Sequence, residues 1–219
     1  MGKSIILACK NLRLHLDKAQ EAMGTSIPVV ELDTSLHSDP AKMREKILEE
    51  ISRIPAAYDT VLVAMGFCGG SWKNVSVDRR IVIPKIDDCI SMLLTTDDVP
   101  KANLKICGCM YITDDLDSGL SIPGIRDSLV AKYGEKKGGI VFDMMFASYN
   151  KVSIIDTGAY DSHTPRMLEF AARSAELIDA SFDHVPGSNI ILQKLVSGRW
   201  DAQFVVLEPW QTAAEEDFC

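Results

Sequence analysis

Short apolar runs alternate with amphipathic segments from one end of the chain to the other. Runs of about four to eight apolar or β-branched residues have the length and composition of buried strands. The segment Thr60–Phe67 is almost wholly apolar, which is typical of a strand covered on both faces. The pattern predicts strands at residues 4–9, 28–32, 60–67, 81–84, 104–112, 152–156 and 204–207.

The segments between these runs carry apolar residues at the spacing of a helix face. Asp39-Pro40 and Thr164-Pro165 are strong start signals. Asp and Thr side chains accept hydrogen bonds from the first helical N–H groups, and Pro lacks the N–H that would stay unpaired. Helices are predicted from residue 12 to Gly24, from Pro40 through Ile54, from Asp87 or Asp88 through Leu94, at 125–133, 140–149 and 189–196, and from Pro165 to about Ala180.

This alternation of strands and helices predicts an α/β fold. It gives βαβ units and a mainly parallel sheet flanked by helices, as in Rossmann-like proteins. At 219 residues the chain can form one domain or two small ones. We expect a single domain over residues 1–219. If that domain has two lobes, the polar loop 114–124, which contains Gly and Pro, is the expected boundary.

The charge balance argues against two classes of partner. Lys and Arg total 23 against 31 Asp and Glu, which gives a net charge of −8. Binding to a nucleic-acid backbone or to an anionic membrane surface depends on clustered basic residues, so neither partner is expected. No run approaches the ~18 apolar residues of a membrane span. The apolar run after Lys3 is too short for a signal peptide, so we expect a cytoplasmic protein.

The six cysteines give the first indication of function. In the cytoplasm, cysteines are more often thiols, metal ligands or redox groups than disulfides. Ligands of an open parallel sheet bind at the carboxyl ends of its strands. Thiolate and imidazole ligands at that edge would suit zinc or an iron–sulfur cluster. The alternative is that each cysteine is a small buried apolar residue. The candidate metal ligands, each following one of the first four predicted strands, are Cys9, His37, Cys68 and Cys89.

The residues after Cys68 can assist such a site. Gly69 and Gly70 let the backbone approach a ligand closely, and with Ser71 they can offer N–H groups to an anion; the alternative is a tight turn. The segment matches neither a P-loop nor the G-x-G-x-x-G pattern, so nucleotide binding is not expected. Asp156 ends a later predicted strand, where it would line the same cleft or form a turn.

Two carboxylates precede Cys89, and they have two possible roles. Asp87 and Asp88 can orient a histidine ligand or act as a general base. The alternative is that they cap the helix that follows.

The remaining cysteines and histidines are less informative. Cys107 and Cys109 form a C-x-C pair whose role stays open between metal binding and core packing. The other histidines lie among polar residues and are expected at the surface: His15, His163 and His184.

Several short segments form a pattern that is more specific together than singly. They are Cys9 after the first strand, Leu36-His37-Ser38-Asp39-Pro40, Gly66-Phe67-Cys68-Gly69, Ile83-Pro84-Lys85, Asp88-Cys89-Ile90, Ile154-Ile155-Asp156-Thr157-Gly158, Pro186-Gly187-Ser188, Lys194-Leu195, Gly198-Arg199-Trp200-Asp201 and Phe204-Val205-Val206. In this pattern the chain resembles, over nearly its whole length, the uncharacterised family catalogued as domain of unknown function 1638.

Three positions depart from the family pattern. Asp87 stands where the family tends to have His, and Met65 where it tends to have Tyr. The turn Thr113-Asp114-Asp115-Leu116 stands where a Thr-Pro-Gly-Trp-like turn is usual. The altered turn indicates a substrate or partner that differs from that of typical members.

The resemblance implies a bacterial or archaeal cytoplasmic protein, often encoded beside corrinoid-dependent methyltransferases, with no established reaction. It also places the four candidate metal ligands at family-pattern positions. We expect a zinc or iron–sulfur protein in or beside corrinoid-linked methyl-transfer or one-carbon metabolism. Its expected partners are a small-molecule ligand, a corrinoid protein or methyltransferase, and a second copy of itself. Two alternatives stay open: a non-catalytic module that senses or delivers a metal, corrinoid or small metabolite, and a scaffold for a methyltransferase.

Overall fold

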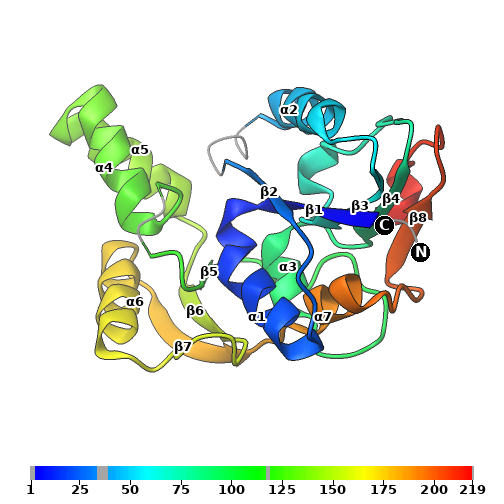
Figure 1. Ribbon diagram of the computed structural model, residues 1–219. Helices are drawn as coiled ribbons and strands as arrows, with labels where there is room; N and C mark the ends of the chain where they lie inside the picture. The colour runs from blue at the N-terminus through cyan, green and yellow to red at the C-terminus, as the bar shows by residue number, and fades with distance from the viewer. Residues whose placement is uncertain (1–2, 34–38, 117–118, 219) are drawn as a thin grey trace. The chain divides into compact units, whose positions relative to one another are not determined.

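The chain divides into two compact units, each with strands and helices (Figure 1). The computed structural model describes residues 3–33, 39–116 and 119–218. Unit 1 comprises residues 1–104 and 188–219, and unit 2 comprises residues 105–187. The α/β class is therefore confirmed. The chain leaves unit 1 after residue 104, beyond the helix Cys89–Leu94, and returns to it at residue 188 to add a final helix and strand.

Unit 1 is built on a five-stranded sheet in the order β2-β1-β3-β4-β8. The first four strands of the chain run parallel, and β8 pairs antiparallel with β4. In this order the chain reverses its direction of winding between β1 and β3, the place where ligand sites form in such sheets. The strands are β1 (Lys3–Cys9), β2 (Val29–Leu32), β3 (Tyr58–Ala64), β4 (Arg80–Pro84) and β8 (Phe204–Leu207).

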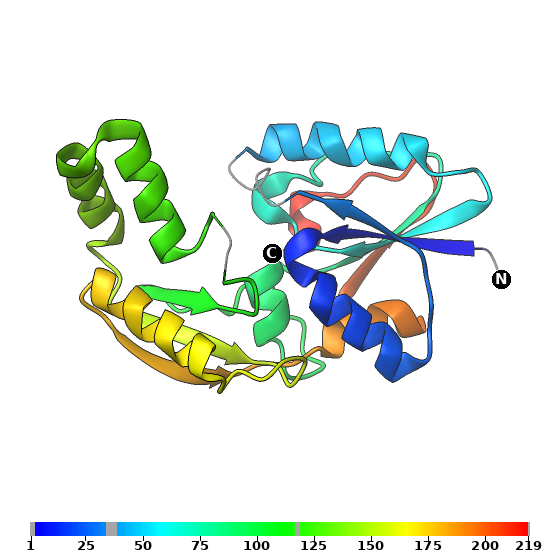
Figure 2. The same ribbon diagram turned by 60° about the vertical axis from the view of Figure 1, so that its left-hand side comes forward.

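Helices cover both faces of this sheet (Figure 2). They are α1 (Arg13–Met23), α2 (Pro40–Arg53), α3 (Cys89–Leu94) and α7 (Ile190–Ser197). Figure 2 shows α2 on one side and α1 with α7 on the other, and α1 packs against α7. The start of α2 is as predicted, because the Asp39 side chain accepts hydrogen bonds from the N–H groups of Ala41 and Lys42, both at 3.2 Å.

Unit 2 is a three-stranded parallel sheet in the order β5-β6-β7. Its elements are β5 (Cys109–Ile112), α4 (Ile122–Tyr133), α5 (Glu135–Phe146), β6 (Lys151–Asp156), α6 (Pro165–Leu177) and β7 (Ser181–Pro186). Phe142 of α5, Val152 and Ile154 of β6 and Met167 of α6 share one apolar core. The helices therefore cover the same sheet face, as two successive right-handed crossovers in one direction require. No helix in the described parts of the chain is long and apolar enough to cross a membrane.

Two predictions for unit 2 were wrong. β7 was not predicted, because its sequence, Ser-Phe-Asp-His-Val-Pro, has no apolar run and it is a partly exposed edge strand paired only with β6. β5 begins at Cys109 rather than at Leu104, because Cys107 and Gly108 form a turn before it.

A buried lysine joins the last part of unit 1 to its earlier part. Lys194 of α7 has a side chain that is only 3% exposed, and its Nζ lies 2.6 Å from carboxylate oxygens of Asp98 and Asp201. Nζ also donates to Oε1 of Gln203 at 2.6 Å. Asp98 follows α3 and Asp201 precedes β8, so one ammonium group links three segments. This contact gives a structural reason for the Lys194 and Asp201 positions of the family pattern.

Replacing Lys194 with Met should lower the free energy of unfolding by about 1–3 kcal/mol, because Oε1 of the buried Gln203 loses its donor. The Asp98 and Asp201 side chains are 73% and 43% exposed, so water can solvate their charges. Chemical denaturation measures the change. The control is Lys101→Met, because Lys101 pairs with Asp97 at 3.1 Å but both side chains are about half exposed. That pair should contribute little, and equal losses in the two variants would contradict the role given to Lys194.

Candidate thiol site at the sheet edge

The segments that leave β3 and β4 are held together at the carboxyl edge of the sheet. The N–H of Cys68 donates to the carbonyl oxygen of Asp87 at 2.7 Å. Gly66 permits this approach, because a Cβ at that position would lie 2.6 Å from the Cα of Asp88. The turn after β3 is therefore fixed against the residues that begin α3.

Three cysteines from the carboxyl ends of three neighbouring strands meet at this place. Cys9 is the last residue of β1, Cys68 follows β3, and Cys89 begins α3 after β4. The Cys89 thiol shares side-chain hydrogen bonds with both Cys68 and Cys9. Cys9 and Cys89 are buried, and Cys68 is half-buried. We call these three residues the thiol cluster.

The surroundings of Cys89 keep its thiol protonated. The hydrogen bond to Cys68 raises the pKa of Cys89 most, and burial and the negative charge of Asp88 raise it further, while the bond to Cys9 acts in the opposite direction. The net result is a Cys89 pKa well above the ordinary thiol value. Cys9 in turn lies 3.4 Å from Oδ1 of Asn11, to which its thiol donates.

The donor atoms of the cluster suit a soft metal, but they do not complete a coordination sphere. Thiolate sulfur is a ligand of zinc and of iron–sulfur clusters. Within the described ranges, however, no three side chains of His, Cys, Asp or Glu are arranged as a metal-binding group. His37 lies outside the described residues. Cys9, Cys68 and Cys89 form no disulfide.

The segment after β3 forms a tight backbone turn. Cys68, Gly69 and Gly70 have φ values of 47°, 66° and 91°, a left-handed run that only the two glycines adopt without strain. The N–H groups of Gly70 and Ser71 donate to the carbonyl of Phe67 at 3.1 and 3.0 Å. Ser71 is also fully buried, and its hydroxyl donates to the same carbonyl. The N–H groups of Gly70 and Ser71 are thus used inside the turn, which is the alternative that the sequence left open, and ligand binding by this segment stays a prediction.

The two carboxylates before Cys89 have different surroundings. Asp88 caps α3, because its Oδ1 accepts a hydrogen bond from the N–H of Ser91 at 2.9 Å. This is the structural alternative that the sequence left open. Asp87 instead lines a cavity, so it is the one of the pair that can meet a ligand.

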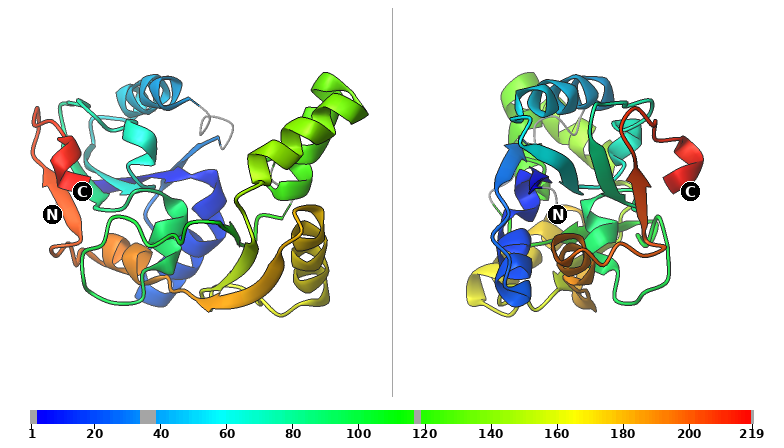
Figure 3. Two further views of the ribbon diagram at one scale, coloured as in Figure 1. Left: turned by 180° about the vertical axis from the view of Figure 1, so that it is seen from behind. Right: turned by 45° about the vertical axis from the view of Figure 1, so that its right-hand side comes forward.

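That cavity has a volume of about 410 Å³ and adjoins the turn that carries Cys68. Its walls come from four segments: α2, the turn after β3, the residues after β4, and the C-terminal turn η4 (Glu215–Phe218), which is drawn in red in Figure 3. The lining residues include Arg44, Gly69, Gly70, Lys73, Asp87 and Glu215. No sequence pattern marks Arg44, Lys73 or Glu215, because they come together only when these segments fold.

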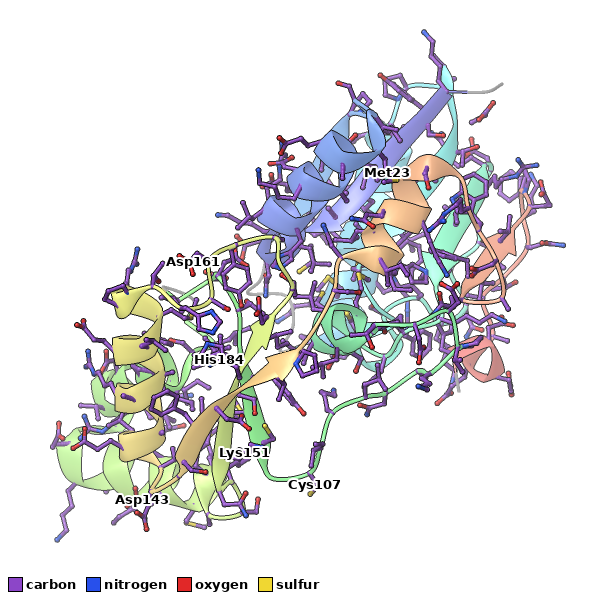
Figure 4. All side chains as sticks on the ribbon, turned by 90° about the horizontal axis from the view of Figure 1, so that it is seen from below. Met23, Cys107, Asp143, Lys151, Asp161 and His184 are labelled. Carbon is purple, nitrogen blue, oxygen red and sulfur yellow. The ribbon has the colours of Figure 1, made fainter. Side chains whose placement is uncertain are left out.

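The other predicted site residues lie in unit 2. Asp156 ends β6, and its Oδ1 accepts a hydrogen bond from the N–H of Gly158 at 3.4 Å, as in a turn. Cys107 is exposed on the loop before β5 (Figure 4). Cys109 is buried within β5, and its thiol donates to the Ser153 hydroxyl at 3.2 Å. The two cysteines of the C-x-C pair therefore have separate surroundings.

The prediction that His15 lies at the surface was wrong. His15 sits on the buried stripe of α1, and burial lowers its pKa to about 4. In unit 2, His163 is exposed while His184 of β7 is half-buried, and their rings stack with centroids 4.2 Å apart. No sequence pattern indicates this pair, because β7 was not predicted.

The comparisons with known proteins identify a family and no activity. The family model described as "Protein of unknown function (DUF1638)" matches residues 31–196. Comparisons with curated proteins and with solved structures gave no match. The matched span includes Cys68 and Cys89, whereas Cys9 precedes it.

Replacing Gly66 with Ala should separate the turn after β3 from the start of α3, because the new Cβ would meet backbone atoms of Asp87 and Asp88 that cannot move aside alone. We expect a loss of about 1–3 kcal/mol in the free energy of unfolding, and faster alkylation of Cys89 under native conditions. Gly139→Ala is the control, because a Cβ there meets nothing within 4 Å. If Gly66→Ala had the same stability and alkylation rate as the wild type, the close approach between the turn after β3 and the start of α3 would not be required.

Proposed function

This chain belongs to the family described as "Protein of unknown function (DUF1638)", and from the chemistry of its sheet edge we propose that Cys9, Cys68 and Cys89 hold a soft metal centre. The centre is either zinc or an iron–sulfur cluster, because both take thiolate ligands. The single observation that carries the proposal is that the carboxyl ends of three neighbouring strands bring Cys9, Cys68 and Cys89 together, with the Cys89 thiol within hydrogen-bonding reach of the other two.

Packing alone is a poor explanation for this arrangement. A buried cysteine that only fills space behaves as a small apolar residue among carbon atoms. Here two thiols reach a third one from separate strand ends, and a thiol is a weak hydrogen-bond donor and acceptor. The cluster therefore adds little stability by itself. Binding of a metal would explain why three sulfur atoms from separate strands lie together.

The fourth ligand decides what such a centre can do. His37 remains the candidate by its sequence position, after a strand whose last residue, Leu32, pairs with Cys9. With four protein ligands the centre would be closed, as structural zinc sites are, and with three it would keep a position for a substrate. When bound, zinc would supply Lewis acidity, and a cluster would carry electrons.

The residues around the centre have separate proposed roles. Asp87, on the cavity wall, is the proposed acid or base group, because Asp88 is used to cap α3. A role in corrinoid-linked methyl transfer rests on the family resemblance alone and stays a prediction. A cytoplasmic location would keep the thiols reduced and belongs to the same proposal.

Anaerobically purified protein should contain stoichiometric zinc, or iron with a brown colour and absorption near about 400 nm. Elemental analysis and an absorption spectrum measure this. Cys68→Ser and Cys89→Ser should lose most of the metal, because serine is a poor ligand for a soft ion. Cys107→Ser is the matched control and should keep it, because Cys107 is exposed and belongs to the other unit.

Two results would contradict the metal proposal. One is wild-type protein without metal after anaerobic purification. The other is unchanged metal content in folded Cys68→Ser. A stoichiometric metal without any turnover of thiol or methyl-donor substrates would favour the alternative function, a module that senses or delivers a metal or small metabolite.

Metal affinity should rise with pH between about 6 and 9. A thiol must lose its proton to bind the ion, and the pKa of Cys89 lies above its ordinary value, so binding releases protons and is weakened in acid. Zinc titrations at several pH values, together with proton release in weakly buffered solution, measure the effect. Affinity that does not change with pH would mean that Cys89 is not a ligand.

A further inference from the structure

We propose that the cavity beside the thiol cluster binds an anionic group, the carboxylate or phosphate of a small ligand, between Arg44 and Lys73. This inference deepens the proposed function, because it names the class of group that the ligand of the site carries. The cavity volume of about 410 Å³ is within the range of small-molecule sites, about 300–1,000 Å³.

Arg44 is fixed on the cavity wall with unused hydrogen-bonding capacity. Its Nη2 donates to the carbonyl oxygen of Gly70 at 2.6 Å, which holds the guanidinium against the turn that carries Cys68. Its Nε is buried and has no hydrogen-bond partner within the described residues. A buried donor without an acceptor is costly, and the planar guanidinium fork matches the oxygens of a carboxylate or phosphate. The guanidinium is thus held beside the cavity as a fixed positive charge, which an anionic ligand in the cavity would neutralise.

Lys73 adds a second positive charge to the same cavity. Its bond to Glu215 raises the pKa of Lys73, and the charge of Arg44 opposes that rise, so the two cations lie near enough to repel each other. An anion that contacts both would be attracted by both and would relieve their repulsion.

Glu215 of the C-terminal turn stands where we expect the anionic group of the ligand. Its carboxylate lies 2.9 Å from Nζ of Lys73, and the two side chains are 57% and 50% exposed. Such an exposed pair is weak and can be exchanged for another anion. Phe218 of the same turn stacks on Phe67, with ring centroids 4.4 Å apart, and so holds the turn in place.

The charges that line the cavity decide when it can attract an anion. Arg44 and Lys73 are balanced by Asp87 and Glu215 while the C-terminal turn is in place. When the Glu215 side chain leaves Lys73, the ammonium group loses its hydrogen-bonded partner, and the cavity becomes more attractive to anions, although the charge of Glu216 still acts on Lys73. Glu215 is therefore an internal competitor of the ligand.

Isothermal titration calorimetry of the purified full-length chain with inorganic phosphate, and separately with acetate, tests this inference at constant ionic strength set by chloride. Wild-type protein should bind at least one of the two, and the tighter one identifies the anionic group. Arg44→Gln and Lys73→Gln should weaken binding about tenfold, since a charged hydrogen bond contributes about that much. Glu215→Gln should instead strengthen binding by up to about fivefold.

The control variant is Arg80→Gln, because Arg80 pairs with Glu208 outside the cavity and should leave binding unchanged. Equal affinity in wild type and Arg44→Gln would overturn the inference, and so would weaker binding in Glu215→Gln. The Glu215 variant changes only an exposed side chain, so the test survives if Arg44→Gln fails to fold. Metal content is measured on the same samples. Protein that contains metal but does not bind phosphate would refute only the anion site. Protein that binds phosphate but contains no metal would refute only the metal centre.

Discussion

The close contact between the segments that follow β3 and β4 is the constraint on which the rest of the site depends. It exists because Gly66 has no side chain to keep the backbone of Asp87 and Asp88 away. The contact sets Cys68 beside Cys89, while the pairing of β1 with β3 brings Cys9 to the same edge. It also places Asp87 on the cavity wall. One short backbone approach thus joins the thiol cluster to the cavity.

Much of the fold could be predicted because its signals are local. The Asp39 and Thr164 caps, each followed by proline, begin α2 and α6 where the sequence places them. Buried parallel strands such as β1 and β3 are continuous apolar runs. β7 lacks such a run, and its place in the sheet is set by pairing with β6, which no local pattern shows. The position of the division between the two units has no local signal either, because it depends on where the chain returns to unit 1.

The site could be predicted only in part. Parallel strands end at one edge, so residues that follow neighbouring strands converge, and this brings Cys9, Cys68 and Cys89 together. The hydrogen-bond partners of individual side chains are harder to predict. The Ser71 hydroxyl donates within the turn after β3, and the Asp88 carboxylate caps α3. Arg44 and Glu215 are distant in the sequence and meet at one cavity through tertiary structure alone.

The thiol cluster and the cavity adjoin at the turn after β3, which carries Cys68 and lines the cavity with Gly69 and Gly70. We propose that the cluster binds a metal through sulfur, and X-ray absorption at the metal edge of the anaerobically purified protein measures the ligand atoms. We expect a shell of about three sulfur atoms at about 2.3 Å, the metal–thiolate distance. A shell of only nitrogen and oxygen atoms would contradict it.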